Sequence, residues 1–467
     1  MELKKKKNRK FYLACSILGM GLLWYNIAFG DNSKETGPED LAVVQKDNQK
    51  FKPQLNQVLL KPNDWPKQIT VGNKPHLVEY AFNDQLNNFV RNQLKQYKTD
   101  YSTIVVIDNE TGNILAAQGY IGREQKFDQS LVLETTHPSA SLIKIITAAD
   151  LVGKGNVNKE TGFEFKGRST TLFKYQITDG RRGPGRLQSF ETAFAKSNNV
   201  IFGKAAIKHS SPSDLVKTAE EWGFNQPLLS EVSVESKIRS TNDEYEFAEM
   251  ASGFNNTTVI NPVHAALMSS IVANDGLLKN PKLITEIKTP NSSENLWDIA
   301  RVEKRVMTPK VAEEMRSMMM ATIEEGTARK QFRKMNRGFK DVLEIGGKTG
   351  SITGGKPFGK RDWFTAYAMP KDHSKGKGIS VSVMNVNVKR WHVKSSFLAK
   401  NVIEYYFRNV KTIPITLAAP EKIYRSTRKF TKAKRGSRYI ASKAKNKKKT
   451  AKQLMTRKSK KERTKKL

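Results

Sequence analysis

Apolar residues recur along this chain at the two spacings that distinguish helices from strands. Helical spacing occurs at Leu86, Phe89, Val90 and Leu94, and again in an amphipathic stretch near 395–408. Strand-like runs cover residues 102–108, 113–118, 342–348, 363–369 and 379–387, with a long and mostly helical middle between the second and third runs. Strands at both ends of a helical insert predict an α+β domain, with one antiparallel, five-stranded sheet flanked by helices and a helical subdomain.

The first thirty residues predict a membrane anchor. Residues 1–10 hold six Lys and Arg against one Glu, and residues 11–30 hold no Asp, Glu, Lys or Arg. Twenty helical residues span about 30 Å, enough to cross a bilayer. The positive-inside rule predicts a cytoplasmic segment 1–10, a single-pass signal anchor 11–30 in the inner (cytoplasmic) membrane, and a periplasmic or extracytoplasmic remainder. Ala28-x-Gly30 also fits a signal-peptidase site, so a cleaved signal is the alternative.

Composition sets two further boundaries. Residues 31–76 are polar and broken by five prolines, which predicts an extracytoplasmic linker before a folded domain over 77–412. Residues 413–467 are expected to form a basic, disordered tail, since 421–467 hold 21 Lys and Arg against two acids, a balance of +19 within the formal +36 of the chain. Because the tail follows an exported domain, anionic lipid or a cell-wall polymer is its expected partner, and nucleic acid is not. A solvated tail without a ligand is the alternative.

Three short strings stand in a fixed order, namely Ser141-Leu-Ile-Lys144, Ser197-Asn-Asn199 and Lys348-Thr-Gly350. None is convincing alone, because Ser-x-x-Lys also occurs at Ser374, Ser426 and Ser442, and Ser-x-Asn at Ser240 and Ser293. Context separates the copies. Only Ser141 precedes an apolar, helix-forming run, and the second string is likewise followed by apolar residues.

Two other kinds of site are excluded by spacing. A phosphate-binding loop at Gly347-Lys348-Thr349 would need a glycine where Val342 stands. The six histidines show no metal-ligand spacing, so neither a metal nor another cofactor is expected.

The first string supplies a nucleophile and a base. On a helix Ser141 and Lys144 share one face, so the Lys144 amine could take the Ser141 proton, provided that the amine is neutral. A free lysine has a pKa near ~10.4. Burial and a second nearby cation, for which Lys348 is the candidate, would lower it. The helix start at Ser141 and the amide of Ser351 are candidate donors to an oxyanion.

The third string supplies groups that could hold an acyl substrate. Gly350 would let its strand approach the substrate closely. The hydroxyls of Thr349 and Ser351 project to the same side of a strand, so both could bind a carboxylate.

The three strings resemble the active-site motifs of the penicillin-recognising Ser-Lys enzymes, which include penicillin-binding proteins and class A β-lactamases. The resemblance extends over roughly residues 77–410. Further segments similar to the family are Thr103–Ala117, Asn261–Ala266, Ala273–Gly276, Glu325–Arg329 and Asp362–Phe364. Ala140, where the family usually has Gly, and Ser351, where Thr is common, are mild departures.

The resemblance implies a role for each residue. Ser141 would be acylated by the D-Ala-D-Ala end of a peptidoglycan stem peptide, and Lys144 would be the general base. Ser197 would relay the proton to the leaving D-alanine while Lys348 shapes the field. Asn199 would hold the substrate amide, and Thr349, Gly350 and Ser351 would form the part of the strand that binds the terminal carboxylate. β-Lactam antibiotics would acylate the same serine.

Within the family, a monofunctional transpeptidase is expected. The Glu-x-x-Leu-Asn segment that supplies the deacylating base of class A β-lactamases is missing after Ser197, because Glu231 and Glu235 lack the Leu-Asn. The N-terminal segment is too short for a glycosyltransferase domain, so a separate glycan polymerase would be needed. The alternatives are an exported D,D-carboxypeptidase or β-lactamase of the same fold, and a catalytically silent cell-wall sensor or scaffold.

Overall fold

The computed structural model describes residues 48–178, 184–299, 302–389 and 391–413. The expected anchor at 11–30, the first part of the expected linker and nearly all of the basic tail lie outside these ranges. No helix within them is long and apolar enough to cross a bilayer.

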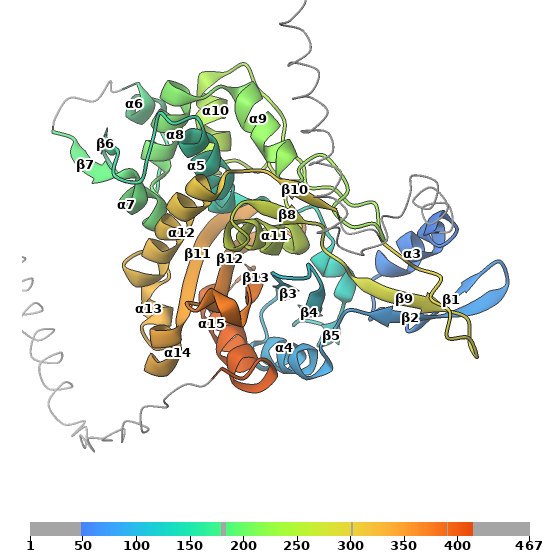
Figure 1. Ribbon diagram of the computed structural model, residues 1–467. Helices are drawn as coiled ribbons and strands as arrows, with labels where there is room; N and C mark the ends of the chain where they lie inside the picture. Colours follow the sequence, from blue (N-terminus) through green and yellow to red (C-terminus); the bar gives the residue numbers. More distant parts are fainter. Residues whose placement is uncertain (1–47, 179–183, 300–301, 390, 414–467) are drawn as a thin grey trace, which may run out of the picture. The chain divides into compact units, whose positions relative to one another are not determined.

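An antiparallel sheet flanked by helices forms the centre of the domain and confirms the α+β fold (Figure 1). Its strand order is β11-β12-β13-β3-β4-β5. The strands are β3 (Tyr101–Asp108), β4 (Ile114–Ile121), β5 (Lys126–Phe127), β11 (Leu343–Gly354), β12 (Gly359–Pro370) and β13 (Ile379–Asn387). The sheet has six strands and not the expected five, because β5 adds a two-residue pairing beside Tyr120 and Ile121. A strand of two residues is too short to show an alternating pattern.

Both faces of the sheet are buried, so its inner strands are apolar at successive positions. In β3, Val105 and Ile107 belong to one apolar cluster. Their neighbours Ile104 and Val106 belong to the other. The first cluster is covered by α11 (Pro262–Ala273), and the second by α4 (Asp84–Tyr97) and α15 (Ser395–Tyr405).

The helical subdomain is inserted between β4 and β11 (Figure 1). Its elements are α5 (Lys144–Gly153), β6 (Gly162–Phe165), α6 (Lys174–Ile177), β7 (Arg186–Ser189), α7 (Phe190–Ala195), α8 (Asn199–His209), α9 (Pro212–Glu221) and α10 (Glu244–Ser252). The return to the sheet runs through β8 (Leu277–Lys279), β10 (Glu303–Arg305), α12 (Pro309–Glu324), α13 (Arg329–Phe332) and α14 (Arg337–Val342). The 3₁₀ turns η1 (Gln129–Val132), η2 (Ala140–Ile143) and η3 (His373–Lys375) and the π-helix η4 (Tyr406–Val410) complete the described elements.

Residues 48–76 differ from the expected linker, because they fold onto the domain. They form α3 (Lys52–Leu59) and β1 (Gln68–Val71), and β2 (Lys74–Tyr80) pairs with β9 (Ile284–Lys288). Phe51, Leu55 and Leu59 recur at helical spacing and are fully buried. The prolines do not break this helix, since Pro53 stands in its first turn, where a proline nitrogen loses no hydrogen bond.

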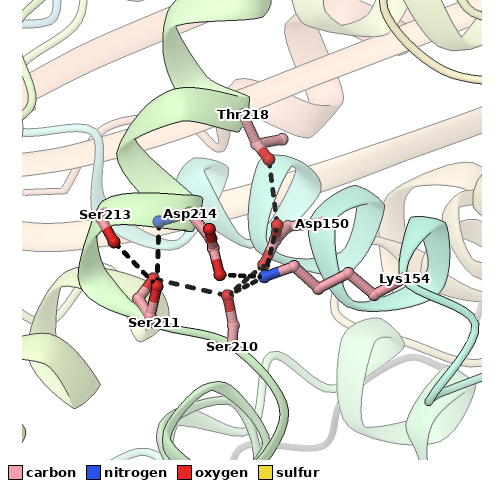
Figure 2. Close-up of polar contacts among 7 residues, drawn as sticks. All are labelled: Asp150, Lys154, Ser210, Ser211, Ser213, Asp214 and Thr218. Atoms are coloured by element: carbon pink, nitrogen blue, oxygen red, sulfur yellow. Dashed lines mark hydrogen bonds and ion pairs between the residues drawn. The ribbon is translucent and has the colours of Figure 1, made fainter.

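Helix α5, which begins at Lys144, is fastened at its other end to the α8–α9 junction (Figure 2). The buried Asp150 carboxylate accepts hydrogen bonds from Ser210 Oγ at 2.5 Å and Thr218 Oγ1 at 3.0 Å. Lys154 Nζ lies 3.2 Å from Asp150 Oδ1 and 3.0 Å from Asp214 Oδ2. A buried carboxylate with this many donors ties three helices together.

We expect Asp150→Asn to lower the free energy of unfolding by about 1–3 kcal/mol, because the buried amide cannot accept all of these hydrogen bonds. Asp214→Asn is the matched control. Asp214 contacts the same Lys154 amine, but its side chain is 52% exposed against 3% for Asp150. An exposed pair contributes about 0–1 kcal/mol. Chemical denaturation of both variants checks this, and equal losses would contradict the role of burial.

Candidate active site

The Ser141–Lys144 pair lies at a tightly wound helix start. Ser141 is in the 3₁₀ turn η2, and Lys144 is the first residue of α5. Lys144 is fully buried, and its Nζ lies 2.9 Å from Ser141 Oγ. The same nitrogen lies 2.7 Å from Asn199 Oδ1 and 2.5 Å from the main-chain oxygen of Ser252.

These three contacts suit both an ammonium, which would donate to all three oxygens, and a neutral amine, so burial decides between the two forms. The oxygens of Asn199 and Ser252 are carbonyls, which only accept hydrogen bonds, and a neutral amine has two hydrogens to donate. Its remaining lone pair is then free for the third partner. That partner is the Ser141 hydroxyl, which is the one group of the three with a proton to give.

Burial explains why the neutral form is favoured. Desolvation, with the charge of Lys348 as a smaller cause, holds the pKa of Lys144 well below its usual value. Lys348 is also fully buried, and desolvation lowers its pKa to about 7. Burial and the nearby Lys348 charge are the two causes expected for Lys144 from the sequence.

The second string brings Ser197 to Lys348. Lys348 Nζ lies 2.9 Å from Ser197 Oγ and 3.1 Å from the main-chain oxygen of Thr349. Ser197 follows α7 and has a left-handed backbone conformation, with φ +58°. Asn198 then caps α8, because its Oδ1 accepts the amide hydrogen of Ile201. The reversal between the two helices thus directs the Ser197 hydroxyl to Lys348.

Asn199 is held on both sides. Its main-chain nitrogen donates to the main-chain oxygen of Ser169 at 2.7 Å, and its side-chain Nδ2 donates to the main-chain oxygen of Thr170 at 3.1 Å. These bonds orient Oδ1 towards Lys144. The substrate contact predicted for Asn199 remains a prediction.

The third string lies on β11, the edge strand of the sheet, next to the nucleophile turn. A Cβ at Gly350 would lie 3.3 Å from the Ala140 Cβ and 3.2 Å from the Trp363 Cβ, so glycine allows this close approach. Trp363 is buried, and its Nε1 donates to the main-chain oxygen of Pro138 at 3.0 Å. Ser351 is exposed on the same strand.

Thr327 was not among the predicted site residues, although it lies in one of the resembling segments. Its hydroxyl is 2.6 Å from the Thr349 hydroxyl. Its main-chain nitrogen donates to the oxygen of Ala195 at 3.1 Å. Thr327 therefore joins the end of α7, which precedes Ser197, to the strand that carries Thr349.

The turn before the nucleophile is under backbone strain. Ala140 has φ +47°, a region that favours glycine. The main-chain oxygen of Ala140 also lies only 1.9 Å from where a Cβ at Gly253 would be, so position 253 admits no side chain. The neighbouring contact between Ser252 and Lys144 involves only a main-chain oxygen and was missed.

A buried arginine fixes the turn after β11. The Arg361 guanidinium donates to the main-chain oxygens of Gly354 and Pro357, the latter at 2.9 Å, and its Nη2 lies 3.1 Å from His137 Nδ1. Desolvation and then the charge of Arg361 lower the pKa of His137 to about 3, so the imidazole is neutral and can accept this hydrogen bond. His137 was assigned no chemistry from the sequence, and its described contacts fit a positioning role for the segment before Ser141.

The structure thus gathers Ser141, Lys144, Ser197, Asn199 and Lys348 around two buried amines, with Thr349 to Ser351 alongside. Within the described ranges, no group of three or more His, Cys, Asp or Glu could hold a metal ion. Fold and site together define the class of penicillin-recognising Ser-Lys proteins. The chain belongs to the family of penicillin-binding protein transpeptidase domains, whose model matches residues 102–404.

The known proteins that are similar to this chain support the same family assignment. The peptidoglycan D,D-transpeptidase PbpA of Mycolicibacterium smegmatis is 25% identical over 250 residues, which are 51% of this chain and 48% of that protein. The chain therefore matches about half the length of this curated relative. Crystal structures of PBPA and of aztreonam-bound PBP3 from Mycobacterium tuberculosis have TM-scores of 0.55 and 0.60 at 19% and 17% identity. The PBPA structure aligns with 70% of this chain and 82% of its own, and the PBP3 structure aligns with 74% of this chain and 81% of its own. Both structures show that the fold is shared.

We expect Lys348→Met to change how stability depends on pH. The pKa of Lys348 is about 7 in the folded protein, against ~10.4 in an unfolded chain. Between these values the unfolded chain binds the proton and the folded protein does not. The free energy of unfolding should therefore rise by about 1.4 kcal/mol per pH unit from this lysine alone.

Denaturation of wild type and Lys348→Met between pH 7.5 and 9.5 measures the difference in slope. Lys360→Met, which removes an exposed lysine from the adjacent strand β12, should keep the wild-type slope. Identical slopes for Lys348→Met and wild type would mean that the Lys348 ammonium remains charged in the folded state.

Proposed function

We propose that this protein is a monofunctional peptidoglycan D,D-transpeptidase that acts through an acyl-serine intermediate. The observation that carries the proposal is the environment of Lys144. Its amine is buried and has two carbonyl acceptors, so its lone pair is left for the Ser141 hydroxyl at 2.9 Å. A serine becomes a good nucleophile when a positioned base accepts its proton.

In the acylation step, Ser141 Oγ would attack the carbonyl carbon of the penultimate D-alanine while Lys144 takes the hydroxyl proton. The oxyanion would be stabilised by the main-chain amides of Ser141 and Ser351. Collapse of the intermediate breaks the peptide bond and expels the terminal D-alanine. Its amine would receive, through Ser197, the proton that Lys144 took from Ser141, which returns Lys144 to the neutral form; the Ser197 hydroxyl is 2.9 Å from Lys348.

Substrate binding would use the remaining predicted residues. The terminal carboxylate would lie against the Thr349 and Ser351 hydroxyls, and Gly350 would leave room for the peptide. Asn199 would orient the substrate amide. In the second step, the amine of a neighbouring stem peptide attacks the acyl-serine carbonyl, which forms the cross-link and returns the proton to Ser141.

The two hydrolases of this fold are less favoured. Rapid deacylation in a β-lactamase needs a carboxylate that activates water. Glu231 is buried, and its Oε1 accepts the amide hydrogens of Leu283 and Ile284 at 2.9 Å each, so this carboxylate holds a strand. Within the described residues, no hydrogen bond or ion pair joins a carboxylate to Ser141 or Lys144. A D,D-carboxypeptidase would differ only in using water as the acceptor.

Location and partners follow from the sequence. We propose that residues 11–30 anchor the chain in the inner membrane with the catalytic domain outside, where stem peptides and β-lactams are reached. A separate glycan polymerase would supply the glycan strands. Anionic lipid or a cell-wall polymer would bind the basic tail.

Labelling with a fluorescent penicillin tests the mechanism. Wild type should form a stable, covalent adduct, and Ser141→Ala should form none. Ser374→Ala is the matched control, because Ser374 also begins a Ser-x-x-Lys string but is exposed and bonded to Asp372. Loss of label in this control, or label on Ser141→Ala, would refute the Ser-Lys assignment. Recovery of free enzyme within seconds would indicate a β-lactamase.

Product analysis on a purified stem-peptide substrate separates the remaining alternatives. Cross-linked dimers identify a transpeptidase, and free D-alanine alone identifies a carboxypeptidase. Penicillin labelling without either product would favour a sensor.

We expect deletion of residues 421–467 to leave penicillin labelling unchanged, since every described site residue lies before position 413. Binding to vesicles of anionic lipid or to isolated cell wall should weaken and lose its dependence on salt. Co-sedimentation with anionic vesicles and with isolated cell wall measures the binding and its salt dependence, with neutral vesicles as the control. Unchanged binding to both anionic materials would refute a targeting role for the tail.

A further inference from the structure

Helices α12, α13 and α14 lie beside the edge strand β11 (Figure 1), and residues of these four elements line a pocket together with Arg333, Met335 and Lys371. It has a volume of about 380 Å³, within the range of small-molecule sites. Its apolar lining consists of Met320, Ile323, Phe332, Met335, Leu343 and Ile345. No residue of the Ser-Lys site lines it.

The charges around this apolar space have one dominant sign. Arg329, Arg333, Lys340 and Lys371 line the pocket, and Glu324 is the single acid among the lining residues. All four cations are exposed at its mouth. Among the described residues, none of the four has a carboxylate within 4.0 Å, although 16 ion pairs of other Lys or Arg side chains occur elsewhere in the domain, such as that of Arg337 with Asp341.

Main-chain oxygens hold two of these cations in place. Lys340 Nζ donates to the oxygen of Arg333 at 2.9 Å. Lys371 Nζ donates to the oxygens of Lys340 and Asp341 at 3.1 and 3.2 Å. An ammonium has three donors, so each lysine keeps at least one for a ligand. The guanidinium groups of Arg329 and Arg333 have no hydrogen-bond partner among the described residues.

We propose that this pocket binds a single-chain anionic amphiphile, with its alkyl chain against the apolar lining and its phosphate or carboxylate at the four cations. The apolar lining accounts for the chain, and the unpaired guanidinium forks fit an anion with several oxygens. An acidic peptide without apolar side chains would match the charge, but it would leave the apolar space unfilled. The proposal is independent of the proposed transpeptidase activity.

Photo-crosslinking of the full chain in the neutral detergent dodecyl maltoside tests the proposal. A dodecyl phosphate with a diazirine in its chain should label residues that line the pocket, as mapped by mass spectrometry. Unlabelled dodecyl phosphate should compete, whereas dodecyltrimethylammonium should not. Rising salt should weaken labelling, because the anion is bound at an exposed rim.

Two double variants isolate the charge. Arg329→Glu/Arg333→Glu should weaken labelling of the pocket about tenfold or more. Lys330→Glu/Lys334→Glu makes the same charge change at neighbouring positions that do not line the pocket, and it should change labelling less than about threefold. Met320→Trp, which fills the apolar space without changing the charge, should also reduce labelling of the pocket. Circular dichroism and thermal unfolding show that each variant is folded.

Three results would overturn the proposal. The first is label that never falls on the pocket residues. The second is equal loss of label in the two double variants. The third is an acidic peptide of equal charge that displaces the probe as effectively as dodecyl phosphate does. That result would mean that the pocket recognises charge alone.

Discussion

Two lysines buried without a carboxylate are the feature on which the rest of the site depends. Lys144 and Lys348 have no exposed surface, and their hydrogen-bond partners among the described residues are hydroxyls and carbonyl oxygens. A buried ammonium that lacks a counter-charge costs several kcal/mol, so burial lowers the pKa of both amines. The same burial is what would make Lys144 a base near neutral pH in the proposed acylation step. A carboxylate beside Lys144 would stabilise the protein and remove the base.

Such an arrangement needs rigid support, because two residues of the site have a strained backbone conformation. Ala140 and Ser197 both have positive φ, and a non-glycine residue in that region costs on the order of 1–3 kcal/mol. Both stand where a catalytic hydroxyl is directed at a lysine. The compensating contacts lie further away. Asp150 fastens the far end of α5, and Arg361 fastens the turn that follows β11.

Much of this could be predicted from the sequence, since long strands and amphipathic helices carry a clear apolar period. The strands now described as β3, β4, β11, β12 and β13 overlap the predicted runs. β5 was missed because two residues have no period. Residues 48–76 were interpreted as a linker because prolines outweighed the helical spacing of Phe51, Leu55 and Leu59. The Lys144–Ser252 contact could not be predicted, since a main-chain oxygen has no side-chain signature, and the partners of Arg361 are brought together only by the fold.

Strand β11 has one neighbouring strand, so other parts of the fold must fix the position of its free edge. Thr327 fixes that edge at the Ser-Lys site. It is bonded to the end of α7 through Ala195 and lies 2.6 Å from Thr349, so it fixes the spacing between the residues that present Ser197 and those that present Lys348. The ordered strings of the sequence are therefore not independent motifs. A shift of β11 at its free edge would lengthen the Ser197–Lys348 contact and, with it, move the charge that lowers the pKa of Lys144.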